Sequence, residues 1–274
     1  NIAIGDNGRL EMPLTNVTLV DNSLSADCQL NPDDGLLCVE EAVYTGTITL
    51  PPNKTGYTLA YQRCCRNVIL DNINDPLETG VTYFSHVSPF ALQECNSQPV
   101  FNDFPEIYIC AGEKFVFNHT AVDPDGDELR YRFCIPSAGS TIDNPNPQVP
   151  STPPFPTVSW ANGFSEDNVF GSGGTITIDE NTGMTMGTPE ILGTYLIGVC
   201  VDEYRDGVLI STTRRDFEYN VVICSPPIVI DCELRGNDCD GDNTISFVNR
   251  TTGADRYMWH FDFPTTDPST TSTI

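Results

Sequence analysis

The segment Phe217-Glu-Tyr-Asn-Val-Val-Ile-Cys224 carries the strand pattern that decides the fold. Its first residues alternate apolar and polar side chains, so an extended chain can bury one face and leave the other in water. Similar short runs, bounded by Gly, Pro, Asn or Asp, recur at 44–50, 57–61, 115–117, 129–134, 175–178 and 195–201. No window of helical length combines amphipathic spacing with end caps. The pattern predicts an all-β fold of tandem Ig-like β-sandwich domains.

The charge balance excludes several classes of protein. The chain of 274 residues has 38 acidic and 13 basic side chains, which gives a net charge of −25. A nucleic-acid-binding protein needs a basic surface to displace counterions from phosphates, so no nucleic-acid partner is expected. No run of about 18 apolar residues is present, and the first residues lack the pattern of a signal peptide, so no membrane insertion is expected either.

The cysteines indicate an oxidising compartment. There are 11 cysteines and three histidines, and no C-x-x-C pair that would mark a zinc site. A set of disulfides in a secreted, extracellular protein explains the long spacings best. Because the number is odd, either one thiol is free or its partner lies beyond one end of the sequence.

Proline-bearing stretches near residues 96 and 225 divide the chain into three expected units: 1–96, 97–225 and 226–274. The middle unit has an ordinary domain size, whereas the last is short for an independent sandwich. We therefore expect the sequence to be a segment of a longer multidomain protein, with neighbouring Ig-like modules of the same chain as partners.

An acidic loop suggests a metal site in the middle unit. In Asp123-Pro-Asp-Gly-Asp-Glu-Leu129, three carboxylates alternate in a turn before a strand, and further acids follow a later strand at Asp202, Glu203 and Asp206. Hard cations such as Ca²⁺ are bound by six to eight oxygens, and strand ends gather at the poles of a sandwich. The expected ligands of a structural Ca²⁺ are Asp123, Asp125, Asp127 and Asp202. The alternative is that the Asp-Gly turn and the acidic residues only shape and solubilise the surface.

The residues 121–131, followed by Ile178-Asp-Glu-Asn-Thr-Gly-Met-Thr-Met-Gly-Thr-Pro189 and Gly193-Thr-Tyr195, resemble cadherin-like and related Ig-like repeats of large bacterial surface proteins. The resemblance covers about 99–224 and implies a sandwich fold. It departs from the repeats in a proline-rich insertion at 137–174. We expect this insertion to be packed, because Phe155, Trp160 and Phe164 would otherwise expose much apolar area, with a binding loop as the alternative.

The other two units carry weaker resemblances. Phe247-Val-Asn-Arg-Thr-Thr-Gly253 followed by Tyr257-Met-Trp-His-Phe261 resembles the start of a PKD domain, without that family's Gly-Asp-Gly turn, and Trp259 is expected in its core. The segment around Tyr61-Gln-Arg-Cys-Cys-Arg-Asn67 resembles part of large secreted proteins of the Bacteroidetes. The resemblance implies export by the type IX secretion system and service as an adhesin, gliding adhesins included.

Four disulfides are expected, although sequence alone does not determine connectivity. The expected pairs are Cys28–Cys38, Cys110–Cys224, Cys134–Cys200 and Cys232–Cys239. The adjacent Cys64 and Cys65 would point to opposite faces of a strand and are therefore expected to bond to different partners.

No catalytic residue is expected, since the nucleophile-elbow, zinc-protease and phosphate-loop motifs are all absent from the sequence. Together with the resemblances above, which imply an adhesin, this absence predicts a non-catalytic structural or adhesive segment of a large extracellular adhesin at the cell surface. Surface glycans and other cell-surface polymers are candidate partners. Two alternatives stay open: a subunit of a self-assembling extracellular filament or sheath, and a carbohydrate-binding module that uses the insertion at 137–174 as an aromatic platform.

Overall fold

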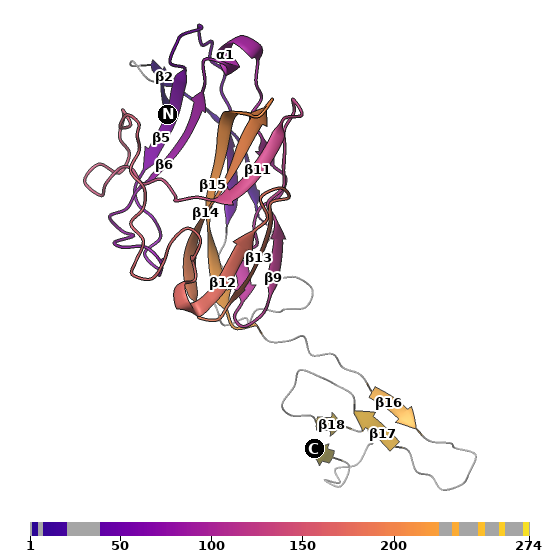
Figure 1. The fold of residues 1–274 in the computed structure, drawn as a ribbon. Helices are drawn as coiled ribbons and strands as arrows, with labels where there is room; N and C mark the ends of the chain where they lie inside the picture. Colours follow the sequence, from indigo (N-terminus) through magenta and orange to yellow (C-terminus); the bar gives the residue numbers. More distant parts are fainter. Residues whose placement is uncertain are drawn as a thin grey trace. The chain divides into compact units, whose positions relative to one another are not determined.

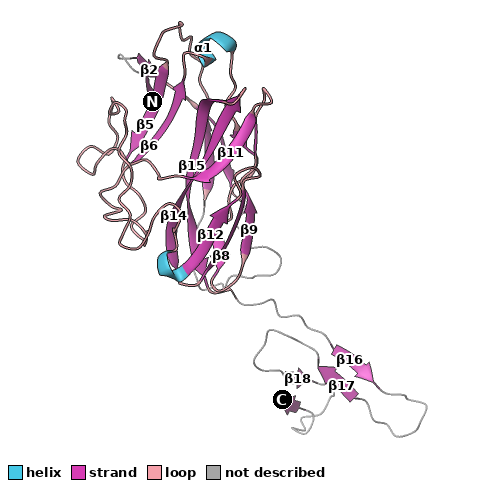
Figure 2. Ribbon diagram, viewed as in Figure 1, coloured by secondary structure: helices cyan, strands magenta, loops and turns pink. Residues whose placement is uncertain are grey.

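The computed structural model describes residues 2–4, 8–20, 39–224 and four short strands between 232 and 273. Contacts divide the chain into two compact units, one comprising Asn1–Ser23 with Gly35–Ile223 and the other Leu24–Asp34 with Cys224–Ile274. The regular secondary structure of the described part is almost entirely β (Figure 2), with helix only in the short turns α1 (Ala91–Glu94) and η1 (Gly171–Gly173). The predicted all-β class is therefore confirmed.

Two sheets form the main body of the first unit (Figure 1). One sheet has the order β11-β14-β15-β8 and the other the order β12-β13-β9. The bounds of their strands are β8 Tyr108–Cys110, β9 Phe115–Asn118, β11 Glu128–Phe133, β12 Gly174–Ile178, β13 Met184–Pro189, β14 Gly193–Arg205 and β15 Val208–Val222. Neighbouring strands are antiparallel except for β8 and β15, which run parallel.

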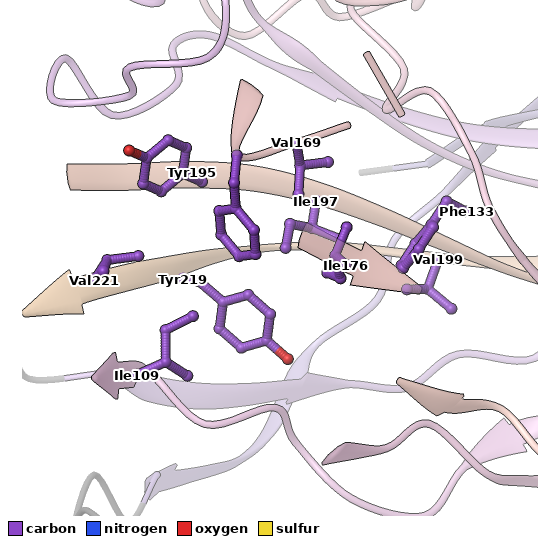
Figure 3. Close-up of a cluster of buried hydrophobic side chains, with 10 residues drawn as sticks. Ile109, Phe133, Val169, Ile176, Tyr195, Ile197, Val199, Tyr219 and Val221 are labelled. Atoms are coloured by element: carbon purple, nitrogen blue, oxygen red, sulfur yellow. The ribbon is translucent and has the colours of Figure 1, made fainter. Parts of the chain in front are cut away.

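The main apolar core lies between these sheets, as the alternation in the sequence predicts. Tyr219 and Val221 of β15 point into it together with Ile197 of β14, and Ile176 contributes from the opposite sheet (Figure 3). Such burial stabilises the fold by about 25 cal/mol for each Å² of apolar surface removed from water. Two sheets that share one core in this way form a β-sandwich.

Residues before position 97 pack against the same body. The sheet β2-β1-β5-β6 and the ribbon β3-β4 are built from them. Their bounds are β1 Ile2–Ile4, β2 Gly8–Leu10, β3 Leu14–Leu19, β4 Glu40–Tyr44, β5 Tyr57–Arg63 and β6 Val81–Val87, with the short pair β7 Val100–Phe101 and β10 Ala121–Val122 nearby in sequence.

A buried asparagine is one of the links between these residues and the sandwich. The fully buried Asn72 donates to the carbonyls of Val169 and Leu196 and accepts from the Leu196 N–H at 2.9 Å. Leu70 and Ile73 share an apolar cluster with Leu196. The segments on both sides of residue 96 therefore lie in one compact unit, and their separate folding as two domains stays a prediction.

The insertion at 137–174 contributes to this packing. Trp160 and Phe164 pack against the main core, and the Phe155 ring lies 4.8 Å from the ring of Phe84. The three aromatic side chains named thus form contacts within the unit.

The second unit is described only through four short strands. β16 (Cys232–Arg235) pairs with β17 (Ser246–Asn249), and β18 (Met258–His260) pairs with β19 (Thr271–Thr273). The side chain of Trp259 and the expected pairs Cys28–Cys38 and Cys232–Cys239 lie outside the described residues.

Among the described cysteines, one expected disulfide is confirmed and one expectation about pairing is wrong. Cys134 and Cys200, an expected pair, form a disulfide with a Cα–Cα distance of 5.9 Å. Cys110 and Cys224 are both disulfide-bonded, as the expected pairing requires.

Cys64 and Cys65, in contrast, bond to each other, so the expectation of different partners is wrong. The strand β5 ends at Arg63, and the alternation of faces on which that expectation rested does not extend to these two residues. Cys95 is exposed and is a free thiol. None of the described helices is long and apolar enough to cross a membrane.

Candidate cation-binding site

The loop between β10 and β11 is folded by its first aspartate. One carboxylate oxygen of Asp123, Oδ1, accepts hydrogen bonds from the backbone N–H groups of Asp125 at 2.9 Å and Asp127 at 3.0 Å. Gly126 has a φ of +83°, a left-handed conformation that glycine adopts without a steric penalty. The Asp-Pro-Asp-Gly-Asp sequence thus closes a tight turn, and the second oxygen of Asp123, Oδ2, is buried without a hydrogen-bond partner.

Glu203 approaches this turn from β14. The residue is fully buried, and its Oε2 accepts hydrogen bonds from the side chains of Asn96, at 3.1 Å, and Ser211. Its other oxygen, Oε1, is buried and receives no hydrogen bond. An unpartnered buried carboxylate oxygen is costly because the desolvated charge lacks compensation.

Asp123, Asp127 and Glu203 together form a cluster that could hold a metal ion. Each residue offers one oxygen, and these three oxygens all lie within 4.8 Å of one another. Carboxylate oxygens suit hard cations such as Ca²⁺, Mg²⁺ or Mn²⁺, whereas zinc sites favour thiolate and imidazole ligands. A bound cation would supply the partner that the two orphaned oxygens of Asp123 and Glu203 lack.

Arg205 compensates part of the negative charge. Its guanidinium lies 2.8 Å (Nε–Oδ1) and 2.5 Å (Nη2–Oδ2) from the Asp127 carboxylate and 3.7 Å from Asp125 Oδ2. The hydrogen bond from Arg205 lowers the pKa of Asp127, while burial raises the pKa of Glu203. In this cluster, Arg205 therefore neutralises the Asp127 carboxylate, whereas burial disfavours the charged form of Glu203.

Two of the four residues expected as ligands lie elsewhere. Asp125 is exposed, and its Oδ2 accepts from the backbone N–H of Ser97 at 2.6 Å. Asp202 lies on the opposite face of β14 from Glu203, where it accepts from Arg132 Nε at 2.7 Å and from the Thr212 hydroxyl at 2.7 Å. The structure thus brings Asp123 and Asp127 together and adds Glu203 in place of Asp202.

The electrostatics of Asp202 explain why it needs no external cation. Burial by itself raises the pKa of its carboxyl group, but the hydrogen bonds from Arg132 and Thr212 and the charge of Arg132 outweigh that effect and lower the pKa. Strand alternation in β14 was a signal that Asp202 and Glu203 face different surroundings, because residues of even number such as Cys200 and Asp202 share one face and Val201 and Glu203 the other.

Asn96 and Arg205 were also missed as parts of the site. Asn96 donates to Glu203 and accepts from Arg205 Nη2 at 2.9 Å, which connects the turn after α1 to the cluster.

Comparisons of the chain with protein-family models, with curated proteins and with solved structures give no match.

Proposed function

We propose that the chain is a non-catalytic, load-bearing segment of a large extracellular adhesin, stabilised by disulfides and by Ca²⁺ at the Asp123–Asp127–Glu203 cluster. The observation that carries the proposal is the pairing of the first and last sandwich strands. β8 and β15 run parallel, with Tyr108 opposite Asn220 and Cys110 opposite Val222.

Parallel terminal strands resist extension because of their geometry. Tension applied before β8 and after β15 pulls the two strands in opposite directions along their length, so the hydrogen bonds between them are loaded together rather than one after another. Further bonds extend the ladder at both ends, from Ala111 N–H to Val222 O at 2.9 Å and from Asn220 N–H to Ile107 O at 3.0 Å. A module with this connection suits a protein that transmits force between a cell and a surface.

Covalent cross-links support the same role. The bond between Cys134 and Cys200 joins β14 to the residue that follows β11 and closes a loop with a sequence separation of 66. Such bonds persist in an extracellular environment and are rare in a reducing one. They also limit how far a loaded domain can extend.

Calcium is the cation that fits this setting best. The cluster is formed by a loop and a strand end, offers carboxylate oxygens only, and is flanked by further polar groups of Asn96 and Ser211. Ca²⁺ accepts such irregular oxygen sets, whereas Mg²⁺ requires near-octahedral geometry. Bound Ca²⁺ would fix the loop of β10 and β11 to β14 and to the turn after α1.

The described histidines support a non-catalytic role. His86 lies 3.1 Å from the Thr58 hydroxyl, and His119 lies 2.8 Å from Arg215. Neither forms a hydrogen bond with a serine or cysteine in the part of the chain that the structure describes. Burial, followed by the charge of Arg215, lowers the pKa of His119 to about 3, so this imidazole stays neutral at physiological pH.

Single-molecule force spectroscopy tests the mechanical proposal. After reduction of its disulfides, the chain pulled through its ends should show one high-force unfolding event for residues 97–224, because Cys110 and Cys224 are disulfide-bonded in the oxidised protein and can divert tension from the β8–β15 ladder. Reduction should lengthen the released chain by at least about 230 Å, because Cys134 and Cys200 alone are separated by 66 positions and an extended residue spans about 3.5 Å.

A second pulling geometry provides the control. Handles at the exposed Leu192 and Ile223 peel β14 from the antiparallel β15 one hydrogen bond at a time, and should therefore unfold the domain at a lower force. Equal forces in the two geometries would contradict the load-bearing role.

We further propose that the full protein is displayed at the surface of a bacterium of the Bacteroidetes after type IX secretion. The resemblances of 121–131, 178–195 and 61–67 support this assignment. Antibodies raised against the folded chain should label intact cells of the source organism, and labelling only after cell lysis would reject it.

One observation favours a filament subunit as the second candidate. Apolar side chains of the β3-β4 ribbon are exposed: Leu14 by 51%, Val17 by 47% and Tyr44 by 52%. A two-stranded ribbon is marginally stable alone and gains from association. Electron micrographs of the native material distinguish the candidates, because a filament subunit forms polymers of regular period and an adhesin does not.

A further inference from the structure

A cavity of about 360 Å³ lies beside the outer face of the β11-β14-β15 sheet, between that face and the proline-rich insertion. Its size is within the range of sites that hold small molecules. Arg132 and Arg214 line it, together with the rings of Phe84 and Phe155 and the disulfide of Cys200.

The charge of this cavity is opposite to that of the chain. Arg132 and Arg214 are charged, and no acidic side chain is among the described residues that line the cavity. The chain as a whole has a net charge of −25 and only 13 basic residues. Arg132 is paired with Asp202, so the charge of Arg214 and the remaining donors of Arg132 together favour an anionic ligand by charge complementarity.

Strand register brings the two arginines together. Cys200 of β14 is opposite Arg132 of β11 on one side and opposite Arg214 of β15 on the other. Side chains in one such row point to the same face of a sheet, and neighbouring strands are about 4.8 Å apart. The two guanidinium groups thus flank the disulfide that forms part of the cavity wall.

Both arginines have donors left for a ligand. Arg132 uses Nε and Nη2 for Asp202, which leaves its Nη1 group. Arg214 stacks over the Phe84 ring at 4.6 Å and forms no ion pair within the part of the chain that the structure describes. Partial burial, followed by the charge of Arg132, lowers the pKa of Arg214, so an anion placed between the two groups would be stabilising.

The remaining lining residues indicate a sugar rather than a peptide. Arg214 and Phe155 both pack against the Phe84 ring, so the Phe155 ring, which lines the cavity, is the apolar surface available to the face of a pyranose. The hydroxyl groups of Ser137 and Thr157 line the same cavity and match the hydroxyl groups of a sugar. A peptide would instead need partners for its backbone amides.

We propose that this cavity binds a uronic-acid residue of an acidic glycan, with the carboxylate held between Arg132 and Arg214 and the pyranose ring against Phe155. The carboxylate would receive charge-assisted hydrogen bonds from two guanidinium groups, the strongest type available to it. This binding activity goes beyond the load-bearing role and does not depend on it.

The test is an NMR titration of the full chain with three probes: methyl β-D-glucuronide, methyl β-D-glucoside and a capped aspartate dipeptide. The first two differ only in the carboxylate. We expect saturable binding of the glucuronide, with the glucoside and the dipeptide at least tenfold weaker. Equal binding of the glucoside, binding of the dipeptide at least as tight as that of the glucuronide, or no saturable binding of the glucuronide would each overturn the proposal.

Two variants with the same change in charge locate the site. Arg214→Gln should weaken glucuronide binding by about tenfold or more, because it removes one charged donor group. Arg130→Gln is the control, since Arg130 lies on the same strand as Arg132 but pairs with Glu128 at 2.8 Å outside the cavity. Equal affinities of the two variants would overturn the assignment. Unfolding midpoints equal to that of the wild type show that a loss of binding does not come from misfolding. An Arg214→Lys variant, which keeps the positive charge, provides a second check on this point.

Discussion

Asp202 and Glu203 are neighbours in β14, yet they belong to two regions that compensate a carboxylate charge in different ways. On one face, Asp202 is neutralised by Arg132 and hydrogen-bonded to Thr212. On the other, Glu203 is buried beside Asp123 and Asp127, and one of its oxygens has no partner. Protein side chains compensate the carboxylate of Asp202, whereas that of Glu203 requires a proton or an external cation.

The difference shows how one strand can serve two purposes. Successive residues of a strand point to opposite faces, so acidic residues adjacent in sequence acquire unrelated partners. The Asp202 face continues into the disulfide of Cys200 and the arginine pair, while the Glu203 face continues into the acidic loop. Stability on the first face should be independent of added metal, and stability on the second should depend on it.

The largest expected effect concerns the covalent bond on the Asp202 face. The double variant Cys134→Ala/Cys200→Ala should lose about 4 kcal/mol of unfolding free energy, because it opens a loop with a separation of 66 in the denatured chain. Urea unfolding measures this loss. The response to Ca²⁺ should survive in the variant, and a loss of that response would show that the two faces are not independent.

Calcium should produce the next largest change. At a free concentration of 100 times the Kd, Ca²⁺ should stabilise the protein by about 2.7 kcal/mol relative to EDTA. For a domain of this size that corresponds to a rise in Tm of about 5–10 °C. The Tm of Glu203→Gln should be higher than that of the wild type in EDTA, because an amide donor faces the other carboxylates, and it should not respond to Ca²⁺.

Removing the charge of Asp202 should cost less. Asp202→Asn weakens the pair with Arg132, whose side chain is half exposed, so we expect a loss of about 1–2 kcal/mol that is the same with and without Ca²⁺. Glu128→Gln is the matched control, since its pair with Arg130 is exposed and should contribute less than about 0.5 kcal/mol. Equal losses in the two variants would show that burial adds nothing to the Asp202 pair.

The smallest effect is a difference in pH dependence. Burial raises the pKa of Glu203 above its ordinary value of 4.5, so in EDTA its contribution to stability falls as the pH rises from 4.5 through the folded pKa. The pKa of Asp202 is lowered from 3.8, so its contribution is lost only as the pH falls below that value. Melting curves between pH 4 and 8 should show the first trend in the wild type and not in Glu203→Gln. Identical profiles would contradict the burial of a carboxylate at 203.

Alternation and turn residues were enough to predict the all-β class and the strands around 129–134, 195–201 and 217–224, because these features depend on local periodicity. The expected bond between Cys134 and Cys200 is confirmed, although the sequence alone did not determine that connectivity. The acidic loop was also recognisable, because Asp123 and Gly126 define a turn by their own chemistry.

The remaining parts depend on contacts that local pattern does not encode. Glu203 was passed over for Asp202 because alternation separates their faces but only the packing of the acidic loop against β14 shows which face meets the loop. The bond between Cys64 and Cys65 was missed because the end of β5 at Arg63 is set by tertiary context. The cavity between Arg132 and Arg214 arises where an insertion of about 40 residues folds back onto a sheet.

Isothermal titration of Ca²⁺ into Glu203→Gln and Asp202→Asn tests the central claim most directly. Both variants remove one negative charge from adjacent positions, so the general electrostatic attraction for cations falls equally in the two. The account predicts that Asp202→Asn binds Ca²⁺ like the wild type and that Glu203→Gln loses the binding. Loss of binding in Asp202→Asn with retention in Glu203→Gln, or equal binding by both variants, would contradict it.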